Sequence, residues 1–326
     1  MATRNEELES QLRAARSRMH GGTAEGEQYD SMLRLNSLSR SLEKLGEKAD
    51  AELYRHFPVA AIAALETHFK SVVAIIVNAG SPYLERGLLL AKDRLKTAVD
   101  VLPSLHRKTV TLGEFIAHSL PFNALSSLEN TLASLLGESL KELIRGAVSP
   151  WAKRNENADQ VPMVADVEAL WEDLAKTFTC RHVLAHEAAT KYEVHYQDAQ
   201  IALQAVSKFT AAVDAILWST VWANEPLTQY EMNMHAWASY RRTRALLAAS
   251  LRKGLEIATE DKERAKFGEL HLDWKWASRR WNNFEESQWH MGSMRPMMKA
   301  LALDQAHEHR LTDVNSWVLQ RRPNGD

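Results

Sequence analysis

Apolar positions in this sequence recur every three or four residues, and this spacing predicts amphipathic helices. No segment shows sustained alternation of apolar and polar residues, and no Asn-Gly or Asp-Gly turn joins two β-rich runs. The pattern therefore predicts an all-α fold. The clearest stripes, with steps of +3, +4 and +3, are Leu35, Leu38, Leu42, Leu45 and Val206, Phe209, Val213, Ile216.

Proline and glycine residues separate the periodic stretches and set the expected helix boundaries. The stretch 163–225 contains neither residue, but two threonines near 177–180 predict a break there, with a new helix beginning at Arg181 and continuing to about Trp222. The other expected helices cover residues 6–19, 31–54, 59–77, 84–101, 123–144, 164–177, 228–263 and 270–289.

Tryptophan becomes frequent after Pro226, and this shift in composition marks the expected domain boundary. Seven of the ten tryptophans lie from Trp222 onward. We expect an N-terminal helical extension over residues 1–50, a helical bundle over 51–225 and a smaller Trp-rich helical domain over 226–326.

Composition and charge narrow the possible functions. With 326 residues, 45% hydrophobic residues and a formal net charge of −2, the chain has no overall charge that attracts it to nucleic acid, so any RNA binding must be local. The single cysteine excludes an internal disulfide framework. The charged N-terminus lacks the apolar segment of a signal peptide, and the apolar run 72–77 is too short to span a bilayer. We therefore expect a cytoplasmic protein without membrane contact.

The sharpest local pattern is the heptapeptide Arg181-His182-Val183-Leu184-Ala185-His186-Glu187. On a regular helix Arg181 and His186 are about 140° apart, so they reach one pocket only if Arg181 lies in a frayed first turn. A histidine side chain, with an ordinary pKa of about 6.5, serves as general acid or base at neutral pH. An arginine side chain stabilises a phosphorane transition state.

This stretch resembles the HEPN superfamily, whose hallmark is an Arg, a polar residue, three further residues and a His. Arg181, His182 and His186 match it, and the resemblance covers roughly residues 51–222. It implies a HEPN-like bundle that cuts RNA without metal or cofactor, using the 2′-hydroxyl as nucleophile and Arg181, His182 and His186 as catalytic residues. It also implies a homodimer that brings two motifs into one cleft. By analogy, such a protein acts as a toxin or an anti-phage effector, with an antitoxin or regulatory protein as a further partner.

Two further hypotheses remain open beside the ribonuclease. The bundle is either a non-catalytic interaction module or a nucleotide-sensing regulator. His182 and His186 also have the spacing of a metal pair, with His195 as a third candidate ligand. Glu66 and His68 are candidates for the bundle interior, although a surface position is expected. His307 and His309 are expected to be solvated, and Cys180 is either a reactive thiol beside Arg181 or a small buried one.

The stretch 267–317 resembles the LprI-type lysozyme-inhibitor domain. The matching residues are Trp281, Phe284, Gly292, Ser293, Pro296, Met297, Arg310 and Leu311. Members carry cysteines that are absent here, so the resemblance implies a helical fold and leaves lysozyme inhibition in doubt. The segment 241–253 holds five basic residues and no acidic one, which suits phosphate binding. The tryptophans either stack on bases or fill a small helical core.

Overall fold

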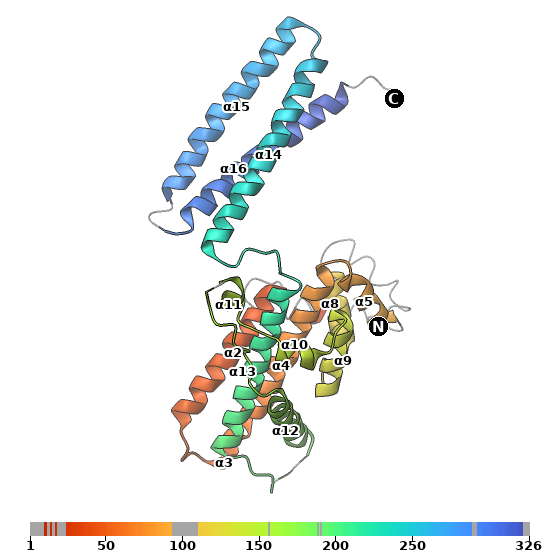
Figure 1. Ribbon diagram of the computed structural model, residues 1–326, viewed down its shortest axis with the longest axis vertical. Coiled ribbons are helices and arrows are strands. Elements are labelled where there is room, and N and C mark those ends of the chain that lie inside the picture. The colour runs from red at the N-terminus through yellow and green to blue at the C-terminus, as the bar shows by residue number, and fades with distance from the viewer. Residues whose placement is uncertain are drawn as a thin grey trace. The chain divides into compact units, whose positions relative to one another are not determined.

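The computed structural model describes residues 24–92, 110–155, 157–187, 189, 191–288 and 292–321, with a few isolated residues near the N-terminus. In these ranges the only regular secondary structure is helical, and a lone bridge joins Val148 and Pro162 (Figure 1). The expected all-α fold is confirmed. The chain forms two compact units, residues 1–223 and 224–326.

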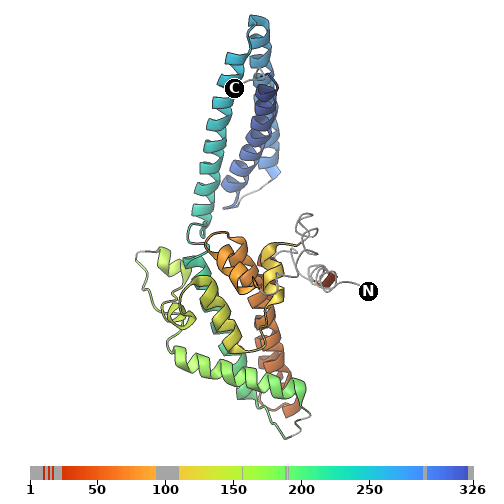
Figure 2. The same cartoon turned by 90° about the vertical axis from the view of Figure 1, so that its right-hand side faces the viewer.

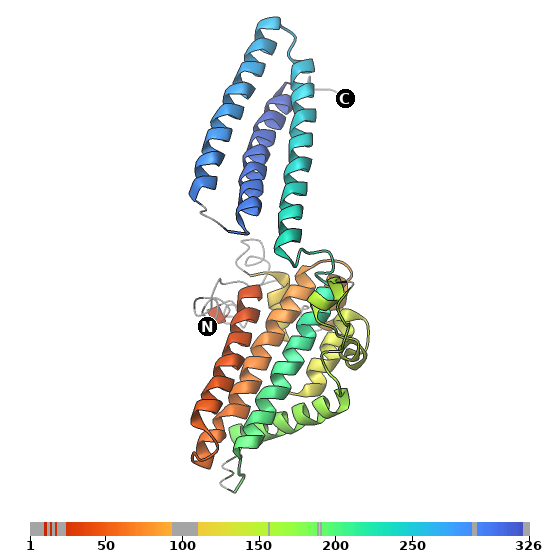
Figure 3. The same cartoon turned by 60° about the vertical axis from the view of Figure 1, so that its left-hand side comes forward.

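The first unit is a bundle around helix α4 (His56–Asn78). Helices α2 (Ala24–Leu45) and α13 (Tyr196–Ser219) lie alongside α4, and α12 (Val167–His186) packs against both α4 and α13 (Figures 1 and 3). Phe69 of α4 and Phe209 of α13 stack in the core, with 5.4 Å between ring centroids. Because α4 is covered by neighbours along most of its surface, it is apolar on nearly every side.

Helix α2 belongs to this bundle, so residues 24–45 are not an extension separate from it. Leu35, Leu38 and Leu42 are buried in the same core as α4 and α13. The periodic stripe had predicted the buried face correctly, but a stripe alone does not reveal which helices cover it. The helix expected at residues 6–19 lies outside the continuously described residues, as does the second half of the one expected at 84–101.

Short helices complete the first unit. They are α3 (Ala51–Tyr54), α5 (Tyr83–Leu90), α8 (Leu112–Ser119), α9 (Leu125–Leu136), α10 (Leu140–Arg145) and α11 (Pro150–Arg154). The single helix expected at 123–144 is wrong, because Gly137 adopts a φ of 81° and ends α9 with a left-handed cap.

The second unit consists of three long helices, α14 (Gln229–Ile257), α15 (Asp261–Gln288) and α16 (Arg295–Gln320) (Figure 2). Leu247, Val314 and Val318 form its small buried core, with Phe267, Trp274 and Trp317 among the partly buried side chains around it. The expected helix boundaries near 263 and 270 are wrong, since α14 ends at Ile257 and α15 already begins at Asp261.

Two helical stretches of the first unit are long and apolar enough to cross a membrane by composition. They are Ala51–Asn78, with a mean hydropathy of 1.6, and Tyr196–Ser219, with 1.3. Their apolar windows are 67% and 61% buried inside the bundle, as core helices of a folded domain are. The run 72–77 is therefore part of a longer apolar helix. Because the core helices of a folded domain have the same composition, Ala51–Asn78 and Tyr196–Ser219 are weak evidence for a membrane span.

Candidate functional site

The Arg181–His186 motif lies in the last turns of α12, which is continuous from Val167 to His186. The expected break at residues 177–180 is wrong. Thr177 and Thr179 donate hydrogen bonds to the carbonyl oxygens four residues earlier, those of Asp173 and Ala175, at 2.7 and 2.9 Å. Their hydroxyl groups are thus satisfied inside the helix.

A continuous helix keeps the side chains of the motif apart. Arg181 and His186 are separated by about 140° around α12, so one copy of the chain does not bring them onto one face. His182 and His186 do share a face, with 5.0 Å between their ring centroids, and both are exposed. The expected convergence of Arg181 and His186 through a frayed first turn is therefore wrong.

Arg181 faces helix α4, where it pairs with Glu66. The Arg181 Nη2 atom lies 3.2 Å from Glu66 Oε1, and the two side chains are 23% and 25% exposed. Burial raises the pKa of the Glu66 carboxyl, and the positive charges of Arg181 and Lys70 oppose this rise. The pair joins residues that are 115 positions apart, so helical periodicity does not predict it.

An open groove of about 490 Å³ borders the end of α12. Arg55, one of the residues that line this groove, donates hydrogen bonds to Glu52 Oε2 at 2.7 Å and to the carbonyl oxygen of Ala189 at 2.9 Å. These contacts bind the segment after α12 to the start of α4. Sequence reasoning missed Arg55 and His56 because they belong to no motif. The lining residues are Glu52, Arg55, His56, Val59, Leu184, Glu187 and Ala189.

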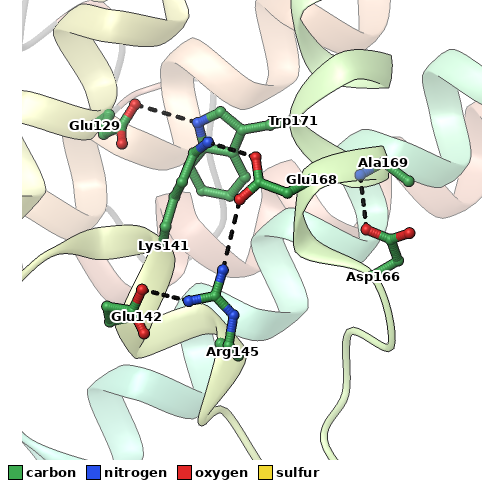
Figure 4. Close-up of polar contacts among 8 residues, drawn as sticks. All are labelled: Glu129, Lys141, Glu142, Arg145, Asp166, Glu168, Ala169 and Trp171. Atoms are coloured by element: carbon green, nitrogen blue, oxygen red, sulfur yellow. Dashed lines mark hydrogen bonds and ion pairs between the residues drawn. The ribbon is translucent and has the colours of Figure 1, made fainter.

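Polar contacts fix the beginning of α12, as Figure 4 shows. Asp166 caps the helix by accepting a hydrogen bond from the Ala169 amide at 2.9 Å. Glu168 is 2.9 Å from Lys141 Nζ and 3.5 Å from Arg145 Nη2, both on α10. These contacts hold the helix at one end, while the two histidines project from its other end.

Trp171 adds a contact between α12 and α9. Its indole Nε1 donates to Glu129 Oε2 at 3.2 Å, and the Lys141 ammonium lies 5.3 Å from the centroid of its ring (Figure 4). The indole is otherwise buried in the core. This arrangement sets the direction of α12 and hence the position of its last turns.

Among the described residues no three or more His, Cys, Asp or Glu side chains are grouped as metal ligands. His195, the third candidate, precedes α13 and lies 3.8 Å from Glu193. His182 and His186 are therefore two adjacent histidines without a third candidate ligand grouped with them among the described residues.

His68 is fully buried in α4, so the expected surface position is wrong. The Ser31 hydroxyl donates to the Gln28 carbonyl oxygen at 2.6 Å and lies 3.1 Å from His68 Nδ1. Burial lowers the pKa of His68 to about 4, so this histidine is neutral and structural.

Cys180 is buried, and the reactive interpretation is contradicted. Burial raises the pKa of its thiol, and a hydrogen bond with Tyr192 opposes this only in part. The motif is therefore preceded by an inert thiol that packs against the core.

In the second unit, His309 is exposed as expected, but His307 is partly buried between aromatic rings. Its ring centroid lies 5.0 Å from that of Tyr240 and 5.1 Å from that of Trp274. Burial lowers the pKa of His307. Of the tryptophans that the structure describes in this unit, Trp274 and Trp317 pack at the small core, Trp276 and Trp281 are exposed, and Trp237 is partly buried.

Comparisons of this chain with protein-family models, with curated proteins and with solved structures found no match.

Proposed function

We propose that this chain is a metal-independent endoribonuclease whose site forms when two copies bring the ends of their α12 helices together. One observation carries the proposal. His182 and His186 are exposed side by side at the end of a firmly anchored helix, five residues or fewer from Arg181. Imidazole groups so placed are available for general acid and base catalysis.

A second copy is needed because one copy separates the groups that the reaction requires. Arg181 and His186 diverge around α12, and each motif supplies one His186. In-line cleavage requires a base for the 2′-hydroxyl and an acid for the leaving 5′-oxygen. A two-fold contact between α12 ends supplies His186 twice and joins each to an arginine. The resemblance to HEPN proteins implies the same assembly.

The proposed reaction is a transfer of the phosphodiester. One His186 accepts the proton of the 2′-hydroxyl as its oxygen bonds to phosphorus, and the other protonates the 5′-oxygen as the phosphorus–oxygen bond breaks. Arg181 stabilises the negative charge of the phosphorane. Among the described residues Glu66 contacts one terminal nitrogen of Arg181, which leaves further N–H groups for a phosphate. His182 is the motif's polar residue and orients the substrate. The products are a 2′,3′-cyclic phosphate and a 5′-hydroxyl.

The test compares wild type with His186→Ala on total RNA and on tRNA, with excess EDTA throughout. His195→Ala is the matched control, because that histidine is also exposed in the first unit. We expect cutting with cyclic phosphate ends by wild type and control only, and light scattering should show a dimer. Undiminished cutting by His186→Ala would contradict the proposal.

The alternative, a non-catalytic interaction module, is favoured by the Arg181–Glu66 ion pair. This pair engages Arg181 within its own subunit, as expected of a structural arginine. Under this alternative the wild type does not cut RNA, and the exposed end of α12 is a docking surface for a partner protein.

A further inference from the structure

Helix α15 exposes large aromatic side chains that its own unit does not use. Its inner side contributes Phe267 and Trp274 to packing against α14 and α16. On other sides Trp276 is 64% exposed, Trp281 60% and Phe284 56%. Tryptophan is rarely left in water to this degree, so these rings indicate a binding surface.

Cationic side chains lie among these rings. Arg279 and Arg280 are exposed, and they follow Trp276 by three and four residues, which places all three on neighbouring positions of one helix surface. Within the described part of the chain neither arginine forms an ion pair. The nearby Glu286 is already neutralised by Arg295 and Lys299, at 3.2 and 2.6 Å.

This combination favours nucleic acid over an apolar protein partner. A protein that covered Trp276 and Trp281 would also have to desolvate two unpaired guanidinium groups, at a large cost without carboxylates of its own. A nucleic acid supplies bases that stack on the rings and phosphates that bind the arginines. Because stacking on a side chain requires an unpaired base, the surface suits a single strand.

Helix α14 adds positive charge to the same unit. Between Glu231 and Glu256 it carries no acidic residue. Its basic side chains in this stretch are all exposed, and they are Arg241, Arg242, Arg244, Arg252 and Lys253. They give the second unit a local field that the chain as a whole lacks.

We propose that α15 binds single-stranded RNA that crosses its exposed side. Trp276 and Trp281, about 140° apart around the helix, stack on bases at the two edges of this side, and Arg279 and Arg280 bind phosphates. The surface deepens the proposed function by supplying a substrate-binding element outside the cleavage site. It rests on that function only for the choice of RNA over DNA.

The test measures the anisotropy of a labelled unstructured oligouridine with the full chain in the His186→Ala background, where no cleavage disturbs binding. Trp276→Ala and Trp281→Ala should each weaken binding about tenfold. Trp151→Ala is the matched control, since that ring is 59% exposed in the other unit. Arg279→Gln with Arg280→Gln should reduce the slope of log Kd against log salt by about 1.4.

Several outcomes would overturn the inference. These are an absence of binding by the parent protein, equal binding by the tryptophan variants, and binding of duplex RNA as tight as that of the single strand. Self-association that the tryptophan changes abolish, without RNA binding, would assign the rings to a protein interface. Equally tight binding of the matching DNA strand would support a single-strand-binding surface on α15 and would contradict its preference for RNA. Binding is measured without cleavage, so the result is valid even if the wild type proves inactive as a ribonuclease. The two proposals can therefore fail separately.

Discussion

Arg181 of α12 and Glu66 of α4 form a partly buried ion pair that joins the candidate motif to the centre of the bundle, with 3.2 Å between Nη2 and Oε1. The pKa of Glu66 is nevertheless raised, because the cost of burying its carboxylate exceeds the attraction of Arg181 and Lys70. Arg181 thus makes an unfavourable buried charge tolerable. The two partners should therefore respond differently to substitution.

We expect Arg181→Gln to lower the free energy of unfolding at pH 7 by about 1–2 kcal/mol, because Glu66 then stays ionised without its partner. Glu66→Gln should change stability by less than about 0.5 kcal/mol, because a neutral amide costs less to bury. Urea denaturation measures both, and the double variant should resemble Glu66→Gln.

The pH dependence gives a further check on this pair. A raised carboxyl pKa means that the folded state binds the proton more tightly, so the loss in Arg181→Gln should fade as the pH falls and Glu66 is protonated. Glu172→Gln is the control, since Glu172 and Lys176 are both 73% exposed at 3.9 Å. A loss independent of pH would assign Arg181 a packing role instead.

His68 should make the first unit sensitive to acid. The folded state keeps it neutral down to about pH 4, whereas the unfolded chain takes up the proton below about pH 6.5. The contribution of neutral His68 to the free energy of unfolding is therefore fully present above about pH 6.5. It is lost as the pH drops toward 4, and the loss is about 3 kcal/mol at most. His118, whose pKa burial also lowers to about 4, acts in the same direction.

His68→Leu should flatten this pH dependence in part, measured by urea denaturation between neutral and acidic pH. The exposed His182 provides the control, and His182→Gln should leave the slope unchanged. A slope that His68→Leu does not alter would show that other groups cause the acid sensitivity.

Two glycines of the second unit offer a matched test of its packing. A Cβ atom on Gly254 of α14 would lie 2.6 Å from Cζ of Phe267, whose ring stacks on Trp317 with 4.7 Å between centroids. We expect Gly254→Ala to destabilise the unit by about 1–3 kcal/mol through this clash.

Gly268 lies within α15, and a Cβ atom there would meet nothing within 4 Å. Gly268→Ala should therefore stabilise the unit by up to about 1 kcal/mol, because alanine favours a helix. Thermal unfolding followed by circular dichroism separates the two variants. Equal effects would contradict the close approach of α14 and α15 at Gly254.

Cys180 should react slowly with iodoacetamide in the native protein, because it is buried and its thiol pKa is raised. The rate should reach that of a free thiol only in denaturant. In the native protein it should still be rising with pH where the rate of a free thiol has levelled off. As the chain has one cysteine, labelling followed by mass spectrometry reports a single site. Rapid labelling of the native protein would show that α12 opens locally.

Parts of the fold were predictable because they depend on local periodicity. Leu35, Leu38 and Leu42 are buried, as their spacing predicted, and the stripe from Val206 to Ile216 forms the inner face of α13. A side chain's position around a helix follows from its place in the sequence, so a stripe alone predicts the helix and its buried face. The all-α class and the shift in composition near Pro226 also came from the sequence.

The geometry of the candidate site was decided by the tertiary structure. The continuity of α12 through Thr177 is supported by tertiary packing, because Thr177, Phe178 and Cys180 are buried against the rest of the bundle, and local propensity does not determine this. His68 is buried where α2 packs against α4, and Arg181 meets Glu66 rather than His186 because α12 packs against α4. Contacts between residues 115 positions apart depend on how helices pack, and a pattern with a period of three or four residues contains no information about that.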